Sequence, residues 1–420
     1  MSTVADPAVR PRGALRLMID PTFGGLFWAK ILSVVGVWTH CIVAAVVVFD
    51  ATGSALMVGL VGVVQFGPQL IFSPLSGKWA DLGNPVRQIL IGRLLCVVGS
   101  GGIAVFLAAM PGVTGAGAAV TVLVGSTVLG IGFVIGGPAM QSIVPSLIRD
   151  GELPTAMALN SVPMTIGRLA GPILGAVLTA QLSAAAAFGA SAVLSLVFAI
   201  FVVIAKFPAP KKRRSDVDYS VRAALRYVRD DHSLFLALIA VATVGLAADP
   251  SITLVPSMAA ELGGGTHLVG ALSAGFGGGA ALGLVALGLT RGKVSPPSTS
   301  AVGLWLLGLG CLLLAVSSGI AMAISGFALA GVGFGWAMAG LGTVVQERAP
   351  DELRGRVMAL WMVGFVGSRP AAAAVLGGTA DHWSVHGAFL IAAVLTLVVA
   401  VFWQLHARRG LGPSVPMTFV

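Results

Sequence analysis

Charged residues are scarce in this chain of 420 residues. Asp, Glu, Lys and Arg together make up only 10% of the sequence, while 57% of it is hydrophobic. A soluble globular domain usually carries about a quarter charged residues, so no water-soluble fold could bury this much apolar surface. The composition therefore predicts an integral membrane protein.

Cysteine is nearly absent too, and its three positions exclude the chemistry that cysteine clusters perform. Cys41, Cys96 and Cys311 each lie within a hydrophobic run, without the spacing of a disulfide framework or a metal site. We therefore expect no metal ion. The first twenty residues also lack the short apolar core of a cleavable signal peptide, so the first long apolar run is expected to be a retained helix.

Phosphate-binding loops are missing as well. Gly77-Lys78 is followed by Trp79, not by Ser or Thr, so the chain has no ATP-binding loop of the GxxxxGK[ST] type. Gly275 and Gly277 lie inside an apolar span with no strand before them, unlike a dinucleotide loop. No metal spacing or nucleophile–base pair occurs at one bilayer depth either. The sequence predicts neither a cofactor nor an enzyme, so transport would be driven by an ion gradient or run downhill.

The net charge of +9 does not indicate a nucleic-acid partner. Nucleic-acid binders gather Lys and Arg on a solvated face beside aromatic residues, whereas here the basic residues lie between apolar spans. The predicted partners are instead the lipid bilayer with its anionic inner leaflet, a small organic substrate and protons.

Twelve apolar spans account for most of the chain. About 20 apolar residues suffice to cross roughly 30 Å of hydrocarbon, and glycine, with 57 residues, lets helices in lipid pack closely. The predicted spans lie near 25–48, 57–77, 88–110, 116–143, 157–180, 184–206, 234–260, 268–290, 298–316, 319–344, 357–380 and 386–406. The fold class is therefore an all-α membrane protein with twelve transmembrane helices in two six-helix bundles.

The domain organisation follows from one polar insert, which separates the two sets of six spans. We expect a cytoplasmic N-terminal tail (1–22), an N-terminal six-helix bundle (23–207), a cytoplasmic linker with an amphipathic helix (208–233), a C-terminal six-helix bundle (234–406) and a cytoplasmic C-terminal tail (407–420). In the linker, Arg222, Arg226 and Arg229 recur at helical spacing, as expected of a helix lying on an anionic leaflet. A solvated linker whose charge merely fixes the topology is an equally good interpretation.

The distribution of Lys and Arg predicts the orientation in the plasma membrane. Basic residues mark cytoplasmic loops, and here they lie in the tails and in the even-numbered connections. The odd connections contain none, and the only charges at the outer ends are Asp50, Glu261 and Asp381. Both termini are therefore expected in the cytoplasm.

An internal repeat relates the two halves. The sequence Gly-Ile-Gly-Phe ending at Phe133 returns 201 positions later as Gly-Val-Gly-Phe ending at Phe334. The triplet Met-Ala-Leu beginning at Met157 returns at the same offset, and Arg168 returns as Arg369. Parallel repeats of six helices are a known transporter architecture.

The connection Gly77-Lys78-Trp79-Ala80-Asp81-Leu82-Gly83-Asn84-Pro85-Val86-Arg87 resembles the cytoplasmic loop motif of the major facilitator superfamily, G-x-L-A-D-R-x-G-R-R. The stretches 138–172 and 346–358, the latter containing Arg354, Gly355 and Arg356, look like the branch of drug exporters, enterobactin-exporter-like proteins and secretion-effector permeases. The resemblance implies a conformational role for Gly77, Asp81, Arg87 and the residues of the second stretch. In this role Asp81 would bind a helix N-terminus or an arginine in one conformation only.

The fifth span contains Gly167-x-x-x-Gly171-Pro172-x-x-Gly175, which matches the core of the family motif associated with antiporters. Glycines allow close helix approach, and proline removes a backbone hydrogen bond and makes a pliable point. Simple helix packing is an equally good explanation. The motif only tilts the interpretation toward export.

Ionisable residues at bilayer depth are functional candidates, because a charge there costs several kcal/mol unless it faces a cavity or a partner. Arg168 and Arg369 lie roughly 17–18 Å from the cytoplasmic ends of their helices, near the midplane. We expect them to face one another across a central cavity, although packing against backbone carbonyls is an equal alternative. Asp249 is the only intramembrane acid, and Pro250 and Pro256 after it predict a kinked helix.

Four polar residues complete the candidate list. Gln65 and Gln69 share one helix face and, with Asn160, are candidate cavity residues, although interhelical hydrogen bonding would explain the two glutamines equally well. An unperturbed histidine titrates near neutral pH, so His40 joins Asp249 as a candidate for proton coupling. A neutral His40 hydrogen-bonded inside the bundle is the more ordinary interpretation.

The sequence thus predicts a secondary transporter that exports a drug-like or siderophore-like organic solute by alternating access, by proton antiport. A proton-coupled or facilitative importer of the same fold is the first alternative. A non-transporting membrane scaffold or sensor, which would need neither a solvated cavity nor midplane arginines, is the second. The substrate itself is not encoded in any motif.

Overall fold

The computed structural model describes residues 12–82, 84–149, 151–205, 207, 221–290, 293–350 and 353–409. These residues form helices and connections and contain no strand. Twelve helical segments within them are long and apolar enough to cross a membrane. The predicted all-α fold with twelve transmembrane helices is confirmed.

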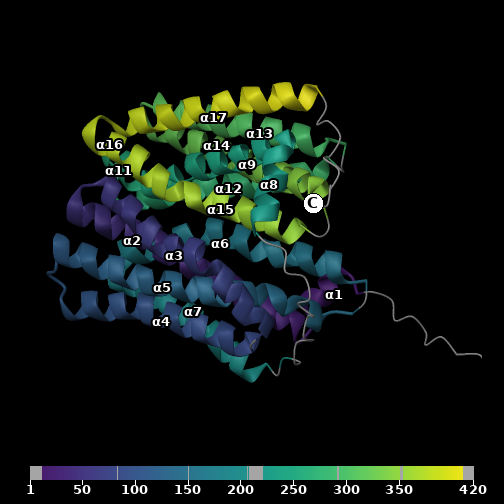
Figure 1. The fold of residues 1–420 in the computed structure, drawn as a ribbon. Coiled ribbons are helices and arrows are strands. Elements are labelled where there is room, and N and C mark those ends of the chain that lie inside the picture. The colour runs from purple at the N-terminus through teal and green to yellow at the C-terminus, as the bar shows by residue number, and fades with distance from the viewer. Residues whose placement is uncertain are drawn as a thin grey trace, which may run out of the picture.

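The N-terminal bundle consists of six long helices, drawn from purple to teal in Figure 1. A short helix precedes them, and its Leu17 is fully buried against the bundle. The segment 12–22, which the sequence assigns to a tail, is therefore docked. The helices are α1 (Ala14–Met18), α2 (Phe23–Thr52), α3 (Ala55–Leu82), α4 (Pro85–Ala109), α5 (Ala116–Ser142), the 3₁₀ turn η1 (Val144–Leu147), α6 (Leu153–Gln181) and α7 (Ala184–Ile204).

The C-terminal bundle repeats this arrangement and lies beside the first bundle (Figure 1). Two of its spans are broken into shorter pieces. The elements are α9 (His232–Ala248), α10 (Pro250–Thr253), α11 (Val255–Glu261), α12 (Thr266–Leu289), α13 (Pro296–Ala315), α14 (Ile320–Arg348), α15 (Arg354–Ala372), the π-helical turn η2 (Ala373–Gly377), α16 (Gly378–His382) and α17 (Val385–Arg408).

Residues 208–220, which are half of the predicted linker (208–233), lie outside the described residues. Its described part is α8 (Val221–Asp230), which packs against α9 and α15. Asp231 then starts α9, since its side chain accepts hydrogen bonds from the backbone N–H groups of Ser233 and Leu234. The boundaries of the linker remain a prediction.

Polar residues at the connections define where several helices begin. The side chains of Asn84, Ser183 and Ser384 each accept a hydrogen bond from a backbone N–H in the first turn of α4, α7 and α17. At the end of α2, Gly53 has a φ of 65°, a left-handed conformation that glycine adopts without strain. These local signals give hairpins of antiparallel helices.

The seventh span is not one helix. The sequence predicts a single span near 234–260 with a kink, and the structure divides it into α9, α10 and α11. Pro250 and Pro256 supply no N–H for the helical hydrogen bonds, so the backbone breaks near them. The break places Asp249 at the end of α9, inside the molecule.

The two bundles meet along α6 with α12 and along α3 with α15 and η2. A methyl group on Gly277 would come within 2.6 Å of the backbone oxygen of Arg168, and one on Gly59 within 2.5 Å of the Ala373 side chain. Close backbone approach of this kind needs glycine at the interface. It brings the residues near the midplane of both bundles together.

Candidate functional site

Arg168 on α6 lies at the interface between the bundles. Its guanidinium carbon is 4.7 Å from the ring centre of Trp38 on α2, and 4.4 Å and 5.9 Å from those of Phe334 on α14 and Phe276 on α12. The last two rings belong to the opposite bundle. Among the described residues, no carboxylate lies within ion-pair distance of Arg168.

Arg369 on α15 has the matching position in the other half. Its guanidinium lies 4.4 Å from the ring centre of Phe66 on α3, again in the opposite bundle. Unlike Arg168, it has an acidic partner, because its Nε lies 3.3 Å from Oδ1 of Asp249. Thr253 donates a hydrogen bond of 2.6 Å to the other oxygen of this carboxylate.

Two small pockets surround these side chains. Arg168 lines a pocket of about 20 Å³, and Arg369 and Asp249 line one of about 10 Å³. Cys41 and Ile252 line both pockets, which are therefore adjacent. Such a volume holds roughly one water molecule. The open cavity that the sequence predicts between the arginines is closed in this conformation, because aromatic rings pack directly against both guanidinium groups.

The energetics of the two arginines differ. A cation over an aromatic ring gains about 0.5–2 kcal/mol, whereas burying an unpaired charge costs several kcal/mol. The cost of burying the charge of Arg369 is offset by Asp249 as well as by Phe66. Among the described residues, Arg168 has aromatic rings but no carboxylate beside it, so it remains the strongest candidate to bind an anion or a strong hydrogen-bond acceptor.

The remaining polar candidates divide between two places. Gln65 lines the pocket of Arg369 and donates a hydrogen bond of 3.1 Å to Sγ of Cys41, while Gln69 is half-buried one turn away and does not line it. Asn160 lies nearer the end that carries the basic residues, where its side-chain oxygen accepts a hydrogen bond of 2.6 Å from Lys30. The structure thus brings Gln65 but not Asn160 to the arginines.

His40 lies inside the N-terminal bundle. One ring nitrogen is 2.9 Å from the Ser100 hydroxyl and the other is 2.9 Å from that of Ser126. The side chain is fully buried and lines neither pocket. This geometry is that of a histidine hydrogen-bonded within the bundle.

The glycine motif of the fifth span packs against α2. A methyl group would come within 2.5 Å of the Val34 side chain at Gly167, 2.4 Å of Trp38 at Gly171 and 2.7 Å of Ile42 at Gly175. Pro172 lines the pocket of Arg168. The motif therefore sets how closely α6 approaches α2, the helix that supplies Trp38.

The residues of the loop motifs lie at the basic end, which is the end of the helices that carries Arg149, Arg348 and Arg408. Gly77 and Asp81 fall within the last turns of α3, and Arg354 and Gly355 begin α15, but their side chains lie outside the described part of the chain. Arg87 is exposed in the first turn of α4, and Arg356 is partly buried in that of α15. The conformational roles of these residues remain predictions.

Sequence reasoning missed the aromatic residues of the site. Phe334 ends the repeated Gly-Val-Gly-Phe sequence, and its counterpart Phe133 contacts Phe66, with ring centres 6.5 Å apart. Each arginine therefore lies over a ring of the opposite bundle, and each of these rings is, or contacts, the phenylalanine of the repeat. The recurrence of an aromatic residue at one offset was the signal available.

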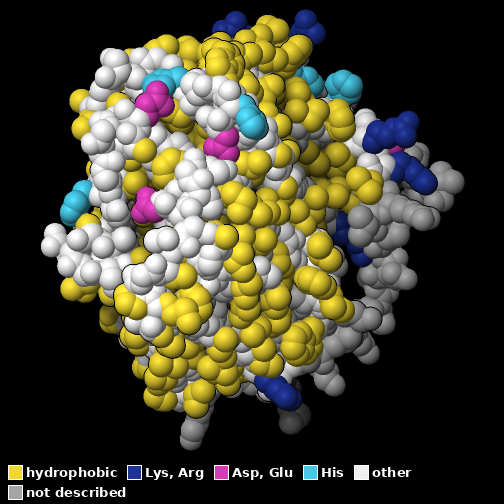
Figure 2. Space-filling model, turned by 90° about the vertical axis from the view of Figure 1, so that its left-hand side faces the viewer, with side chains coloured by type: hydrophobic (Ala, Val, Ile, Leu, Met, Phe, Trp, Pro, Cys, Tyr) yellow, Lys and Arg dark blue, Asp and Glu magenta, His cyan; other side chains and the backbone are white. Residues whose placement is uncertain are grey.

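Sequence reasoning also missed a contact between the bundles at the acidic end, which carries Glu261 and Asp381 and faces the viewer in Figure 2. Asp381 on α16 accepts hydrogen bonds from the backbone N–H groups of Ala55 and Leu56, at 2.6 and 3.1 Å, and from the Ser54 hydroxyl. A carboxylate at a helix N-terminus is stabilised by the unsatisfied N–H groups and the helix dipole. Asp381 thus closes this end of the interface.

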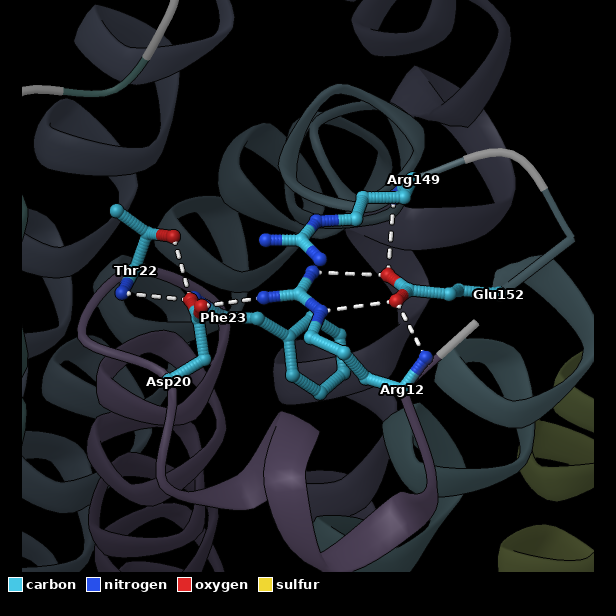
Figure 3. A network of polar contacts seen from close by, with 6 residues as sticks. All are labelled: Arg12, Asp20, Thr22, Phe23, Arg149 and Glu152. Carbon is cyan, nitrogen blue, oxygen red and sulfur yellow. Dashed lines mark hydrogen bonds and ion pairs between the residues drawn. The ribbon is translucent and has the colours of Figure 1, made fainter. Parts of the chain in front are cut away.

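The third feature that sequence reasoning missed is a network of polar contacts at the basic end (Figure 3). The buried carboxylate of Glu152 accepts three hydrogen bonds of 2.8 Å from the side chain and backbone of Arg12. Arg12 also pairs with Asp20. The hydrogen bonds from the Arg12 side chain lower the pKa of Glu152 to about 2.

Comparisons with known proteins agree with this architecture. The model of the transmembrane secretion effector family matches residues 13–410. Enterobactin exporter EntS of Salmonella typhi is 25% identical over 387 residues, which cover 86% of each chain. That of Shigella boydii serotype 18 is 25% identical over 431 residues, covering 95% of this chain and 96% of the relative.

Solved structures share the fold. A bacterial homologue of the iron transporter ferroportin, in an inward-facing state, has a TM-score of 0.71 at 16% identity, covering 94% of this chain and all of that one. A POT family transporter in complex with a thioalcohol-conjugated peptide also has a TM-score of 0.71, at 12% identity, with coverages of 92% and 96%. The family match together with this fold shows that the chain is a multi-pass membrane transporter, not an enzyme, and belongs to the transmembrane secretion effector family of the major facilitator superfamily.

Proposed function

We propose that this transporter exports a small organic solute carrying negative charge, which binds between Arg168 and Arg369 during alternating access. The observation that carries the proposal is the position of Arg168. Its guanidinium lies between the bundles over rings from both of them, without an ion-pair partner among the described residues. A guanidinium stays charged at any physiological pH, so an anionic solute would supply the missing counter-charge.

Separation of the bundles would open this site. The pockets at the arginines have room for about one water molecule each in the present conformation. A solute can therefore enter only when the rings of one bundle move away from the arginine of the other. Closing the bundles around the solute and opening them on the other side would complete the transport cycle.

Asp249 is the proposed site of proton coupling. Its ion pair with Arg369 lies at the end of α9, so gain of a proton would release this pair and alter the site between the arginines. Proton antiport requires that the solute and the proton are bound in alternation. The solute would therefore bind while Asp249 is ionised and leave when protonation of Asp249 rearranges the site.

We propose the plasma membrane as the location, with both termini cytoplasmic. The basic residues Arg149, Arg348 and Arg408 lie at one end of the helices, and the acidic residues Glu261 and Asp381 lie at the other. Single cysteines introduced at Ser384 and at Ser298 test the orientation with an impermeant thiol reagent on whole cells. Only the cysteine at position 384 should be labelled, and labelling at position 298 instead would reverse the orientation.

The test of function combines binding with direction. Purified protein is screened by thermal shift against organic acids, each paired with its neutral amide, with enterobactin included because relatives are named for its export. The acids should stabilise the protein more than the amides. Everted vesicles with an acidic interior should then accumulate the stabilising acid. Accumulation in right-side-out vesicles only would favour the importer, and stabilisation by amides alone would contradict the anionic solute.

A further inference from the structure

A groove of about 850 Å³ lies outside the interface of the two arginines, at the basic end of the C-terminal bundle. Its floor is formed by apolar residues of the transmembrane helices α9 and α15. Its rim, on the side of the membrane surface, is formed by α8. The lining side chains include Leu225, Arg226 and Arg229 of α8, Phe235 and Ile239 of α9, and Val363 of α15.

The floor of the groove is apolar and open. Phe235, Ile239 and Val363 are 48%, 39% and 51% exposed, and Leu225 on the rim is 52% exposed. From the start of α9 at His232 to the last lining residue, Ala242, the helix rises about 15 Å at roughly 1.5 Å per residue. This depth equals about half the hydrocarbon thickness of a bilayer, which is the reach of one acyl chain.

The rim supplies the charge for a headgroup. Arg226 and Arg229 line the groove with exposed side chains, and Asp230 beside them is the one acidic residue among the lining residues. The rim therefore keeps a net positive charge. The opposite face of α8 is fixed in place, because Ala224 and Tyr227 are buried and the Tyr227 hydroxyl donates a hydrogen bond of 3.4 Å to the backbone oxygen of Arg348.

We propose that this groove binds one anionic phospholipid, with its phosphate at Arg226 and Arg229 and an acyl chain between α9 and α15. The parts of the groove follow the same order as the parts of a phospholipid. The cationic groups lie at the membrane surface, where the headgroup would be, and the apolar floor extends one leaflet deep, as an acyl chain does. Arginine binds phosphate oxygens through two parallel N–H groups, and basic helices next to a membrane attract anionic lipids. The inference does not depend on the solute or on the direction of transport.

The occupied groove would connect the lipid to the transport cycle. Val363 and Gly364 lie on α15, the helix that carries Arg369. An acyl chain between α9 and α15 would fill the space between the helix that ends at Asp249 and the helix of its ion-pair partner. Lipid binding is thus expected to influence how these two helices separate.

Delipidated full-length protein tests the proposal by native mass spectrometry during titration with phosphatidylglycerol or with phosphatidylcholine. We expect tighter binding of phosphatidylglycerol. The double variant Arg226→Gln/Arg229→Gln should bind it about 25-fold more weakly, since each arginine near an anionic surface contributes roughly fivefold. Arg408→Gln/Arg409→Gln is the matched control, because it removes two exposed arginines that also lie at the basic end of the molecule, at the end of α17. It should leave the affinity for phosphatidylglycerol unchanged.

Position is tested with phosphatidylglycerol that carries a photoreactive group in its acyl chain. Cross-links should map to 225–242 and 360–364, and Val363→Trp, which fills the groove with a bulky side chain at an exposed position, should abolish them without affecting the yield of folded protein. Equal affinity for the two lipids, equal loss in the control variant or cross-links elsewhere would each overturn the proposal.

Discussion

Arg369 and Asp249 form an ion pair inside the membrane-spanning part of the molecule, with 3.3 Å between Nε and Oδ1. The pair joins α15 to the break between α9 and α10, so the charge on Asp249 is coupled to the position of a helix at the bundle interface. Neither residue is more than 7% exposed. Bulk water therefore cannot stabilise the charge that is left without a partner when Asp249 gains a proton.

Replacing Asp249 by Asn tests proton coupling, because the amide keeps the shape of the carboxylate and cannot exchange a proton. We expect transport driven by a pH gradient to be abolished, while exchange of solute for solute across proteoliposomes survives. Asp50→Asn, at an exposed acid at the end of α2, is the control and should keep the response to pH. If the Asp249 variant still responds, the proton travels elsewhere, and His40 is the next position to change.

The glycine motif predicts a steric effect. Gly171→Val should destabilise the protein by about 1–3 kcal/mol, the usual cost of overpacking, because a methyl group alone would lie 2.4 Å from the Trp38 side chain. Gly102→Ala is the matched control, since that helical position has open space around it. Melting temperatures in detergent measure both. Equal melting temperatures would show that α6 and α2 can move apart without cost.

The positions of apolar and basic residues along the chain were sufficient to predict the fold. Hydrophobic spans and the alternation of basic connections are local properties of the chain, and the membrane forces each apolar span into a helix that satisfies its own hydrogen bonds. The repeat relating Arg168 to Arg369 also predicted that the two arginines belong to equivalent helices. These features need no knowledge of which helices touch.

Contacts between distant helices could not be predicted in this way. The rings over Arg168 come from Trp38, Phe276 and Phe334, which lie on three helices and belong to two bundles. Asp381 similarly caps a helix that begins more than three hundred residues earlier. Such pairs depend on how the bundles rotate against each other, and one sequence contains no record of that rotation.

The hydrogen bonds of Asp381 predict that this residue limits opening of the interface between the bundles at the acidic end. Asp381→Ala removes the acceptor of hydrogen bonds from Ala55, Leu56 and Ser54, and hydrogen bonds to a charged group contribute about 1.5–3 kcal/mol. We expect that end of the interface to open more often. Cys41, which is buried beside both central pockets, should then react with an external thiol reagent on the order of tenfold faster.

The background for this measurement is Cys96→Ala/Cys311→Ala, which leaves Cys41 as the only thiol. Glu261→Gln is the matched control, because this acid lies at the same end but pairs with His386 of its own bundle. It should leave the labelling rate unchanged. Equal rates in Asp381→Ala and in Glu261→Gln would refute this role of Asp381.

The network of Arg12 and Glu152 predicts a pH dependence of stability. The pKa of Glu152 falls from 4.5 to about 2 in the folded protein, chiefly through the hydrogen bonds from the Arg12 side chain. A lowered pKa means that the carboxylate contributes stability above about pH 4.5, and that this contribution is lost as the pH falls toward 2. Glu152→Gln should therefore lower the melting temperature at pH 7. The difference in melting temperature between this variant and the parent should shrink as the pH falls from about 4.5 toward 2. Exposed Glu347, changed to Gln, should show no such difference.

Arg168 gives the sharpest prediction, because it lacks an ion-pair partner among the described residues and lies over Trp38 and Phe334. Arg168→Gln removes the charge, whereas Arg168→Lys keeps the charge and loses the planar fork that binds two acceptor atoms at once. If Arg168 binds an anionic solute, the Gln variant should lose most of its affinity for the acid and little of that for the neutral amide, about 1.5–3 kcal/mol for the acid, while the Lys variant should lie between it and the parent. The Gln variant should also be at least as stable as the parent without solute, since it no longer buries an unpaired charge. If Arg168 is instead a structural cation held by the rings, glutamine should lower the melting temperature and reduce the affinities for acid and amide equally. Thermal shift and binding measurements on the same three proteins separate these two outcomes.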